Sequence, residues 1–339
     1  MIVVRSPFRI SFAGGGSDLP AYYRRFGGAV VSTTIDKYMY LVIHPYFNPK
    51  IRVKYSRLED VERVEDIQHP IVRECLTRHR IPKGMEIASF ADVPAGSGLG
   101  SSSAFTVGLL HALEAHQGRS VSASELAAAA CDVEINRLGE PIGKQDQYAS
   151  AFGGLSYIQF NSDDSVEVER LIVTPKTLRG FERRLMMFYL GQERSAGAIL
   201  REQSANMADP AMAAGVARMV ELAGQFRRAL ESSRLDECGH LLNENWRLKR
   251  GLAGGVSSEY VDEMYDRALA SGASGGKLLG AGTGGFLLLY CEAERQEKVR
   301  CSLKELREMP FRFSEGGSQV IFSDNSEYLE NIPLQNATM

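Results

Sequence analysis

Cysteine is scarce in this sequence, and its spacing argues against two classes of protein. The cysteines are odd in number, widely scattered and free of any Cys-x-x-Cys pair, which disfavours both a disulfide framework and a zinc site. None lies beside a histidine or in a basic glycine-rich turn, so we expect each to be a small buried hydrophobic residue rather than a nucleophile. The five are Cys75, Cys131, Cys238, Cys291 and Cys301.

Long apolar runs and a strong excess of charge are also missing. Phe286–Cys291, among the longest apolar runs, is far shorter than the roughly 20 residues that cross a bilayer. Met1–Pro7 lacks the basic region and apolar core of a signal peptide. The net charge of -3 gives no attraction to nucleic acid or anionic membranes. We therefore expect a cytoplasmic protein whose partners are small molecules, with neither nucleic acid nor membrane among them.

The length and the order of the expected elements indicate two domains. A chain of 339 residues exceeds the size at which a single hydrophobic core stops growing. Strand-like alternation dominates the beginning, as at Ile35–Ile43, whereas helical patterns dominate after residue 190. The change near residues 175–185 predicts an N-terminal domain over residues 1–180 and a C-terminal domain over residues 181–339. With no repeat or long linker, the two should pack directly on each other.

Apolar periodicity, caps and turn residues predict the individual elements. We expect strands at 2–5, 9–12, 35–43, 85–93, 155–160, 166–173, 185–190, 284–291 and 318–323. We expect helices at 70–80, from the serine run to Gly118, and at 122–138, 195–207, 210–231, 234–248 and 258–271.

The segment Pro94–Ala104 has the composition of an anion-binding loop. Three glycines at alternate positions and three consecutive serines open directly onto an amphipathic helix. Glycines let the backbone approach a bulky anion, and the free N–H groups of a first helical turn favour phosphate. Serine hydroxyls can add hydrogen bonds to phosphate or ligate magnesium. The alternative is a flexible turn with a serine N-cap, although a cap needs only one such serine.

Two better-known phosphate motifs do not fit the sequence. The Gly-Lys pairs at 143–144 and 276–277 are followed by glutamine and leucine, so neither forms a P-loop. A Gly-x-Gly-x-x-Gly pattern at Gly280–Gly285 runs into a strand-like segment rather than a helix, which excludes the Rossmann context. A glycine turn between two strands can instead pack against a ligand or against the first glycine loop.

Two acidic residues are candidates for chemistry. Asp146 lies in a polar stretch just past an expected helix end, where it could take a proton from a hydroxyl while Lys144 holds it ionised; a turn-bonding aspartate is the alternative. Glu134 lies near the apolar stripe of its helix and therefore needs a partner. Magnesium is one candidate partner, and the structural alternatives are an ion pair with Arg137 and a position at the rim of the helix face.

The turn Arg9–Asp18 brings a guanidinium, close-approach glycines and a carboxylate within ten residues. Such a set suits a polyol substrate, because aspartate accepts sugar hydroxyls and arginine neutralises a transferring phosphoryl group. The structural alternative is a tight turn.

Together, the three glycine segments resemble the superfamily of galactokinase, homoserine kinase, mevalonate kinase and phosphomevalonate kinase (GHMP kinases) over nearly the whole chain. Pro7–Asp18 is similar to the first, substrate-side motif, Pro94–Ala104 to the second, which holds the ATP phosphates, and Leu279–Gly285 to the third. The resemblance implies an α+β fold with ATP between the domains. The N-terminal domain should resemble domain 2 of ribosomal protein S5, and the C-terminal domain should be ferredoxin-like.

The resemblance also implies an ATP-dependent kinase that uses Mg²⁺. Asp146 falls at the catalytic base, and Arg9 takes the place of the basic residue that assists it. Glu134 falls at the magnesium-binding acid, with Ser102 favoured as its partner over the neighbouring serines. The residues implied in ATP binding are Pro94, Gly96, Ser97, Gly98, Leu99, Gly100, Ser101, Ser102 and Ser103.

One departure from the galactokinases narrows the expected substrate. Galactokinases carry Gly-Glu-His-Thr-Asp where residues 14–18 are Gly-Gly-Gly-Ser-Asp, so the acid and imidazole that would contact galactose are absent. The segment is more similar to the D-glycero-D-manno-heptose 7-phosphate kinases and the related fucokinases. This implies phosphorylation of the anomeric hydroxyl of the heptose 7-phosphate, on the GDP-heptose route. A fucokinase-like kinase of an unphosphorylated sugar and a non-catalytic sugar or nucleotide sensor are the alternatives.

A phosphorylated sugar needs cations for its remote phosphate. The candidates are Arg194, Lys249 and Arg250, each of which could equally lie on a solvated helix face or in a loop salt bridge. The residues that we expect around the sugar are Gly15, Gly16, Ser17, Asp18, Lys144, Gly282, Gly284, Arg194, Lys249 and Arg250. The expected partners are thus a sugar phosphate and ATP, and a homodimer is compatible with the sequence.

Overall fold

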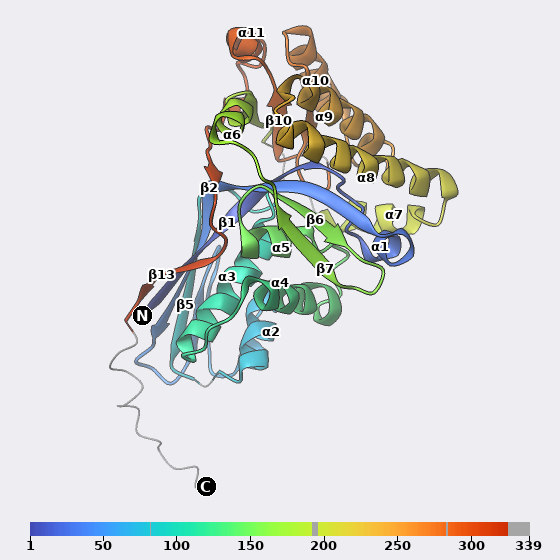
Figure 1. The fold of residues 1–339 in the computed structure, drawn as a ribbon. Coiled ribbons are helices and arrows are strands. Elements are labelled where there is room, and N and C mark those ends of the chain that lie inside the picture. Colours follow the sequence, from blue (N-terminus) through green and yellow to red (C-terminus); the bar gives the residue numbers. More distant parts are fainter. Residues whose placement is uncertain (82, 192–195, 283, 325–339) are drawn as a thin grey trace.

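The computed structural model describes residues 1–81, 83–191, 196–282 and 284–324 (Figure 1). The strands are β1 (Ile2–Ala13), β2 (Gly28–Pro45), β3 (Ile51–Lys54), β4 (Leu58–Val61), β5 (Met85–Ala91), β6 (Ser156–Phe160), β7 (Val166–Arg170), β8 (Leu185–Tyr189), β9 (Gly275–Leu278), β10 (Phe286–Tyr290), β11 (Arg307–Glu308), β12 (Phe313–Ser314) and β13 (Gln319–Ser323). The α-helices are α1 (Pro20–Phe26), α2 (Pro70–His79), α3 (Ser101–His116), α4 (Ala123–Cys131), α5 (Gln145–Phe152), α6 (Pro175–Glu182), α7 (Ala196–Asn206), α8 (Pro210–Glu231), α9 (Leu235–Arg250), α10 (Glu259–Ala270) and α11 (Ala293–Ser302). None of the described helices is both long and apolar enough to cross a bilayer.

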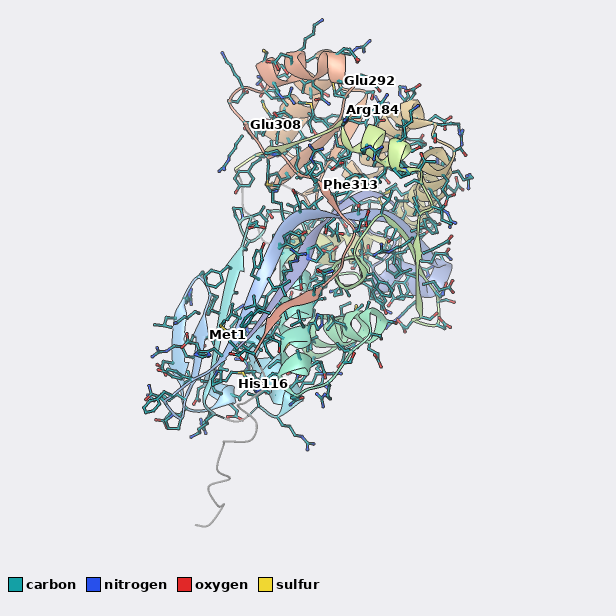
Figure 2. The ribbon with its side chains drawn as sticks, turned by 60° about the vertical axis from the view of Figure 1, so that its left-hand side comes forward. Met1, His116, Arg184, Glu292, Glu308 and Phe313 are labelled. Atoms are coloured by element: carbon teal, nitrogen blue, oxygen red, sulfur yellow. The ribbon has the colours of Figure 1, made fainter. Side chains whose placement is uncertain are left out.

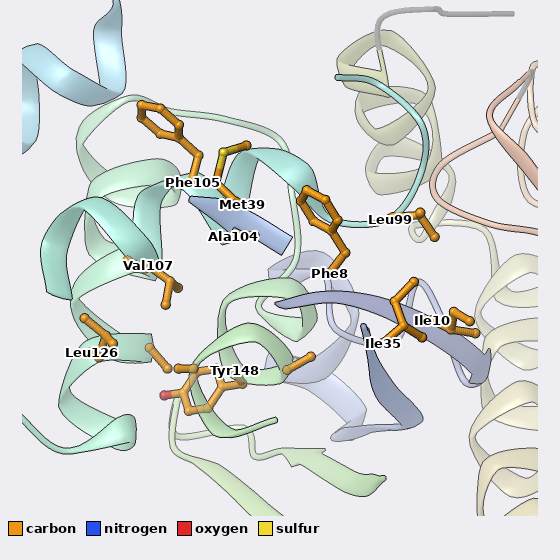
Figure 3. Close-up of a cluster of buried hydrophobic side chains, with 14 of the residues drawn as sticks. Phe8, Ile10, Ile35, Met39, Leu99, Ala104, Phe105, Val107, Leu126 and Tyr148 are labelled. Atoms are coloured by element: carbon orange, nitrogen blue, oxygen red, sulfur yellow. The ribbon is translucent and has the colours of Figure 1, made fainter. Parts of the chain in front are cut away.

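The larger sheet is built around two long antiparallel strands, β1 and β2. Within the described residues it has nine strands. Six follow the order β13-β1-β2-β5-β3-β4, β6 and β12 pair with β2, and β7 pairs with β6. Helix α3 packs closely on β1 and β2, because Gly108 leaves no side chain between its backbone and Leu41. Figure 3 shows Leu99, which precedes α3, in the same buried cluster as Phe8 and Ile10. The segment before α3 is therefore anchored in the core.

The smaller sheet belongs to the C-terminal half and has the order β11-β8-β10-β9 in the described residues. Its two central strands are apolar and largely buried, which suits strands that are covered on both faces. At the start of β8, Arg184 forms an ion pair of 2.6 Å with Glu292, and Figure 2 shows the two side chains together in this half.

The end of the chain returns to the first sheet. β12 pairs with β2 and β13 pairs with β1, so the red and blue ends of the ribbon lie side by side in Figure 1. The predicted boundary at residue 180 separates the strands of the two sheets up to β11. Residues 313–323 also follow this boundary, but they belong to the sheet of the N-terminal half.

Several elements differ from the sequence expectations. The first two expected strands are one continuous strand, β1, whose bulges beside Arg9 and Ala13 interrupt the alternation without ending the strand. The helix expected over 122–138 ends at Cys131 and continues as a π-helical segment, Asp132–Arg137. The short elements α1, β3, β4, α5, α6, β9 and α11 were not expected, since short segments carry a weak periodic signal.

Burial confirms the expectation for four of the cysteines, and Cys301 is the exception because it is exposed on α11. Burial raises the pKa of the Cys238 thiol to about 12, and that of Cys291 also rises, so these thiols stay protonated at neutral pH.

A cluster of aromatic rings joins the two halves. Phe12 of β1 stacks on Phe226 of α8 with ring centroids 5.4 Å apart, and meets Phe181 of α6 edge-on at 5.1 Å. Tyr290 of β10 and Phe313 of β12 extend the contacts. The cluster draws on both sheets, which agrees with the expected direct packing of the two halves.

Replacement of Phe226, which is fully buried, tests this joint. Phe226→Ala should lower the free energy of unfolding by about 3–5 kcal/mol, because it leaves a cavity beside the rings of Phe12 and Phe181. Phe47→Ala removes the same side chain from a fully exposed position and should change stability by less than about 0.5 kcal/mol. Urea unfolding of both variants is the measurement, and equal midpoints would show that the cluster does not hold the halves together.

Candidate active site

All three glycine segments line one cavity between the two halves of the protein. Its volume is about 390 Å³. The residues predicted for the site that line it are Arg9, Gly15, Gly16, Asp18, Gly96, Gly98, Gly100, Ser101, Ser102, Ser103, Glu134, Asp146, Lys249, Gly282 and Gly284. Those that do not line it are Ser17, Pro94, Ser97, Leu99, Lys144 and Arg250. Arg194 lies outside the described residues.

Asp146 and Arg9 form a two-pronged ion pair. Arg9 Nε donates to Asp146 Oδ1 at 2.6 Å and Arg9 Nη2 donates to Oδ2 at 2.7 Å. The guanidinium is nearly buried, whereas the carboxylate is 27% exposed toward the cavity. Asp146 lies in the first turn of α5, where the helix dipole also favours a negative charge. The bulge in β1 beside Arg9 places its side chain below this turn.

Lys144 is not the cation beside Asp146, contrary to the sequence expectation. Its ammonium group donates to Asp164 at 3.2 Å and lies 4.7 Å from the ring centroid of Tyr23. Side chains two positions apart at the start of a helix point in different directions. The closeness of Lys144 and Asp146 in the sequence therefore did not make them an ion pair.

The second glycine segment presents an uncapped helix N-terminus to the cavity. Gly96, Gly98 and Gly100 all have positive φ, at 71°, 81° and 75°. The N-cap of α3 is Gly100, which has no side chain to bond the first-turn N–H groups. The alternative of a serine N-cap is therefore wrong. The free N–H groups and the helix dipole make this end of α3 suited to an anion.

The third glycine segment packs against the second, as the sequence analysis allowed. A Cβ atom on Gly280 would lie 2.5 Å from the Cα atom of Gly98, and one on Gly285 would overlap the backbone of Ser97. The two loops are thus in backbone contact and fix each other's position. Arg9 adds a tether, since its Nη1 donates to the Gly98 carbonyl at 2.6 Å.

Glu134 is a buried carboxylate with no cationic partner among the described residues. It accepts hydrogen bonds from Ser102 Oγ at 2.8 Å and from Gln147 Nε2 at 2.7 Å, and it is 1% exposed. Burial raises its pKa, which these hydrogen bonds partly oppose. The expected alternative of an ion pair with Arg137 is wrong, because that side chain bonds Asp132 and Glu74.

Asp18 links the first glycine turn to α5. Its two oxygens accept from the Gly16 N–H at 3.0 Å and the Gln145 N–H at 3.3 Å. Burial, and next the charge of Asp146, raise the pKa of Asp18. The Ser17 hydroxyl instead exchanges hydrogen bonds with the Ala29 backbone and faces away from the cavity.

Lys249 is the cation that the C-terminal half contributes to the cavity wall among the described residues. It is 7% exposed and donates to the Gly280 carbonyl. Burial, followed by the charge of Arg9, lowers the pKa of Lys249 to about 8. Arg250 instead pairs with Asp262 at 3.2 Å, which accounts for its absence from the cavity wall.

Sequence reasoning missed the glutamines of the site. Gln145 and Gln203 line the cavity, and Gln147 holds Glu134. Gln145 and Gln147 lie on either side of Asp146 in the sequence. This position next to the predicted base was the signal that could have indicated them. Gln203 lies in a helix whose sequence carries no motif.

Comparison with known proteins places this geometry in a family. The model of the GHMP kinases N terminal domain matches residues 68–154, and that of the GHMP kinases C terminal domain matches residues 226–307. The chain belongs to the GHMP kinases. This confirms the family and the α+β fold with N- and C-terminal domains that the glycine segments implied.

Individual relatives of this GHMP kinase span most of its length. D-glycero-alpha-D-manno-heptose 7-phosphate kinase of Campylobacter jejuni is 26% identical over 319 residues, which cover 90% of this chain and 93% of the relative. The crystal structure of a D-glycero-D-manno-heptose 1-phosphate kinase from Bacteroides thetaiotaomicron superposes with a TM-score of 0.77 at 26% identity, covering 95% of this chain and 100% of the other. The bifunctional fucokinase/GDP-fucose pyrophosphorylase of Arabidopsis thaliana is 28% identical over 328 residues, which cover 89% of this chain and 31% of that protein.

The contact between the two glycine loops can be tested with a matched pair of glycine variants. Gly280→Ala should destabilise this GHMP kinase by about 2 kcal/mol or more, since the new methyl group meets backbone atoms and φ is 80°. Gly215→Ala, on helix α8 with no atom within 4 Å of the new methyl, should stabilise it by about 0.5–1 kcal/mol. Thermal unfolding gives both values. A neutral effect of Gly280→Ala would mean that the loops do not hold each other.

Proposed function

We propose that this protein is an ATP-dependent sugar kinase that phosphorylates the anomeric hydroxyl of D-glycero-D-manno-heptose 7-phosphate to give the 1,7-bisphosphate, on the GDP-heptose route. The observation that carries the proposal is that the Asp146–Arg9 pair and the uncapped N-terminus of α3 face the same cavity. Phosphoryl transfer to a hydroxyl requires a proton acceptor and a phosphate site that lie close to each other.

Asp146 is the proposed base. Arg9 occupies one lone pair on each carboxylate oxygen, and a carboxylate has about four such sites, so acceptor capacity remains. The anomeric oxygen attacks the γ-phosphorus as its proton passes to Asp146, and the bond to the β–γ bridging oxygen breaks to release ADP. Arg9 neutralises charge near the transferring phosphoryl group, and because it also binds Gly98, the base and the phosphate loop keep a fixed separation.

ATP would place its phosphates on the backbone of residues 96–103. Glu134 and Ser102 fit a magnesium ion, because a buried carboxylate without a cationic partner adjoins a hydroxyl beside the phosphate loop. The described residues contain no cluster of three or more His, Cys, Asp or Glu that could hold a metal, which agrees with an ion bound largely through nucleotide phosphates. When bound, magnesium would neutralise charge on the phosphate oxygens.

The choice of sugar rests on the first glycine turn and on the relatives. Gly15 and Gly16 line the cavity without side chains and leave room for a long sugar. The two heptose phosphate kinases that match over most of the chain support a phosphorylated heptose, although their names place the phosphate on different carbons. Lys249 supplies a positive charge on this side of the cavity.

Asp146→Asn tests the reaction. The variant should lower kcat for heptose 7-phosphate by about 10²–10⁴-fold with little change in the KM for ATP, because it removes the proton acceptor and weakens its pair with Arg9 but leaves the backbone of residues 96–103 unchanged. Asp60→Asn is the matched control, since Asp60 also bonds an arginine, Arg52, but lies outside the cavity wall. ADP release is measured with heptose 7-phosphate, heptose 1-phosphate, fucose, galactose and mannose.

The panel separates the proposal from its alternatives. Turnover of fucose alone would favour an unphosphorylated substrate, as in the fucokinase relative. No turnover with any sugar would favour a sensor, and full activity of Asp146→Asn would exclude the proposed base.

Glu134→Gln separates a metal-binding role from a structural one. Burial raises the folded-state pKa of Glu134, so its ionised form lowers stability once the pH rises through that pKa. The glutamine variant should therefore have a higher Tm at neutral pH, with a smaller difference toward pH 4. Its kcat should fall about 100-fold or more and the Mg²⁺ concentration for half-maximal activity should rise. Glu62→Gln, on an exposed loop, is the control. Wild-type activity of Glu134→Gln would show that Glu134 does not bind the magnesium ion.

A further inference from the structure

Helix α7 forms one wall of the cavity and presents a single polar side chain to it. Its cavity-lining residues recur at helical spacing along one stripe, Ala196, Gly197, Leu200 and Gln203. Three of the four are small or apolar. Any polar recognition from this wall therefore comes from Gln203.

Gln203 is buried without a partner for its amide nitrogen among the described residues. The residue is 1% exposed, and Nε2 has no hydrogen-bond acceptor there. A buried donor that is unpaired costs free energy, and native proteins keep few of them. Because Gln203 is one of the residues that line the cavity, a bound ligand can supply the missing acceptor.

A second unpaired amide lines the same cavity. Gln145 is 4% exposed, its Oε1 accepts from Ser11 Oγ at 3.3 Å, and its Nε2 has no acceptor among the described residues. Lys249 adds an ammonium group, which donates to the Gly280 carbonyl. Asp18, the nearby carboxylate, already accepts backbone N–H groups on both oxygens. Two amide donors of the wall thus lack acceptors among the described residues.

Contacts of α7 place Gln203 beside the first glycine turn. Glu202 accepts from the Gly254 N–H at 3.0 Å, and Asn206 donates to the Leu252 carbonyl at 2.9 Å. Leu252 in turn lies 3.5 Å from the position of a Cβ atom on Gly16. The helix that carries Gln203 is thus held near the first glycine turn, where the acceptor sugar is proposed to bind.

We propose that Gln203, together with Gln145 and Lys249, binds oxygen atoms of the acceptor sugar, and that Gln203 is a specificity-determining residue. This inference rests on the proposed function. A site that donates to a substrate oxygen rejects an analogue without that oxygen, because the buried donor then stays unpaired. A hydroxyl and a phosphate both offer such an oxygen, and the variants below distinguish them.

Gln203→Leu removes the donor and keeps an apolar side chain of similar reach. It should raise the KM for heptose 7-phosphate about tenfold, while the KM for ATP stays within about twofold. Gln225→Leu makes the same change on α8, outside the cavity wall, and should alter neither value. The Tm of each variant is measured in parallel. If Gln203→Leu does not fold, Gln203→Asn, which retains the amide on a shorter side chain, serves as the second variant.

Gln203→Glu identifies the oxygen that is bound. If Gln203 contacts the sugar phosphate, the new carboxylate should raise the KM for heptose 7-phosphate far more than that for the unphosphorylated heptose. If it contacts a hydroxyl, both KM values should rise by similar factors. Either result supports the inference.

An unchanged KM for the sugar in Gln203→Leu, or equal increases in the KM for sugar and for ATP, would overturn the inference while the proposed function stands. If wild-type protein transfers phosphate to none of the sugars, the proposed function fails and this inference fails with it.

Discussion

The arrangement of the site depends on the guanidinium group of Arg9. It bonds the carboxylate of Asp146 with two nitrogen atoms and the carbonyl of Gly98 with the third. A planar, permanently charged fork suits this role, because it orients two partners at once and does not lose its proton. Through this group, strand β1, helix α5 and the second glycine segment share one fixed geometry. A lysine in its place would supply the charge without the orientation.

Around this group, the cavity is assembled from backbones that approach closely. Gly98 meets Gly280, and Gly285 meets Ser97, so the loop before α3 and the loop after β9 support each other. The two loops come from different sheets, and the ring contacts of Phe181 with Phe12 of β1 and with Tyr290 of β10 connect those sheets. The cavity is thus a product of the joint between the halves rather than of either half alone.

The site and its surroundings contain groups that the fold stabilises poorly. Glu134 is a buried carboxylate without a cationic partner among the described residues. Lys277, which does not line the cavity, is a buried lysine whose ammonium donates to the Phe12 carbonyl at 3.3 Å. Burial lowers the pKa of Lys277, as it does that of Lys249, and burial raises that of Glu134. Uncompensated groups of this kind cluster at functional sites, because a ligand supplies what the fold does not. In the apo protein they lower stability.

The sequence by itself determined the three glycine segments, the family, and most of the long helices, because glycine torsions, helix N-termini and apolar periodicity are local properties. It also indicated Asp146, Glu134 and Arg9 through their motifs. Only the tertiary structure decided that Arg9, 137 positions away, and not Lys144 is the partner of Asp146, that Glu134 bonds Ser102 rather than Arg137, and that Gln203 faces the cavity. Ion pairs and cavity walls are chosen by distance in space, and the bulges in β1, the π-helical segment at Glu134 and the joint between the sheets set those distances.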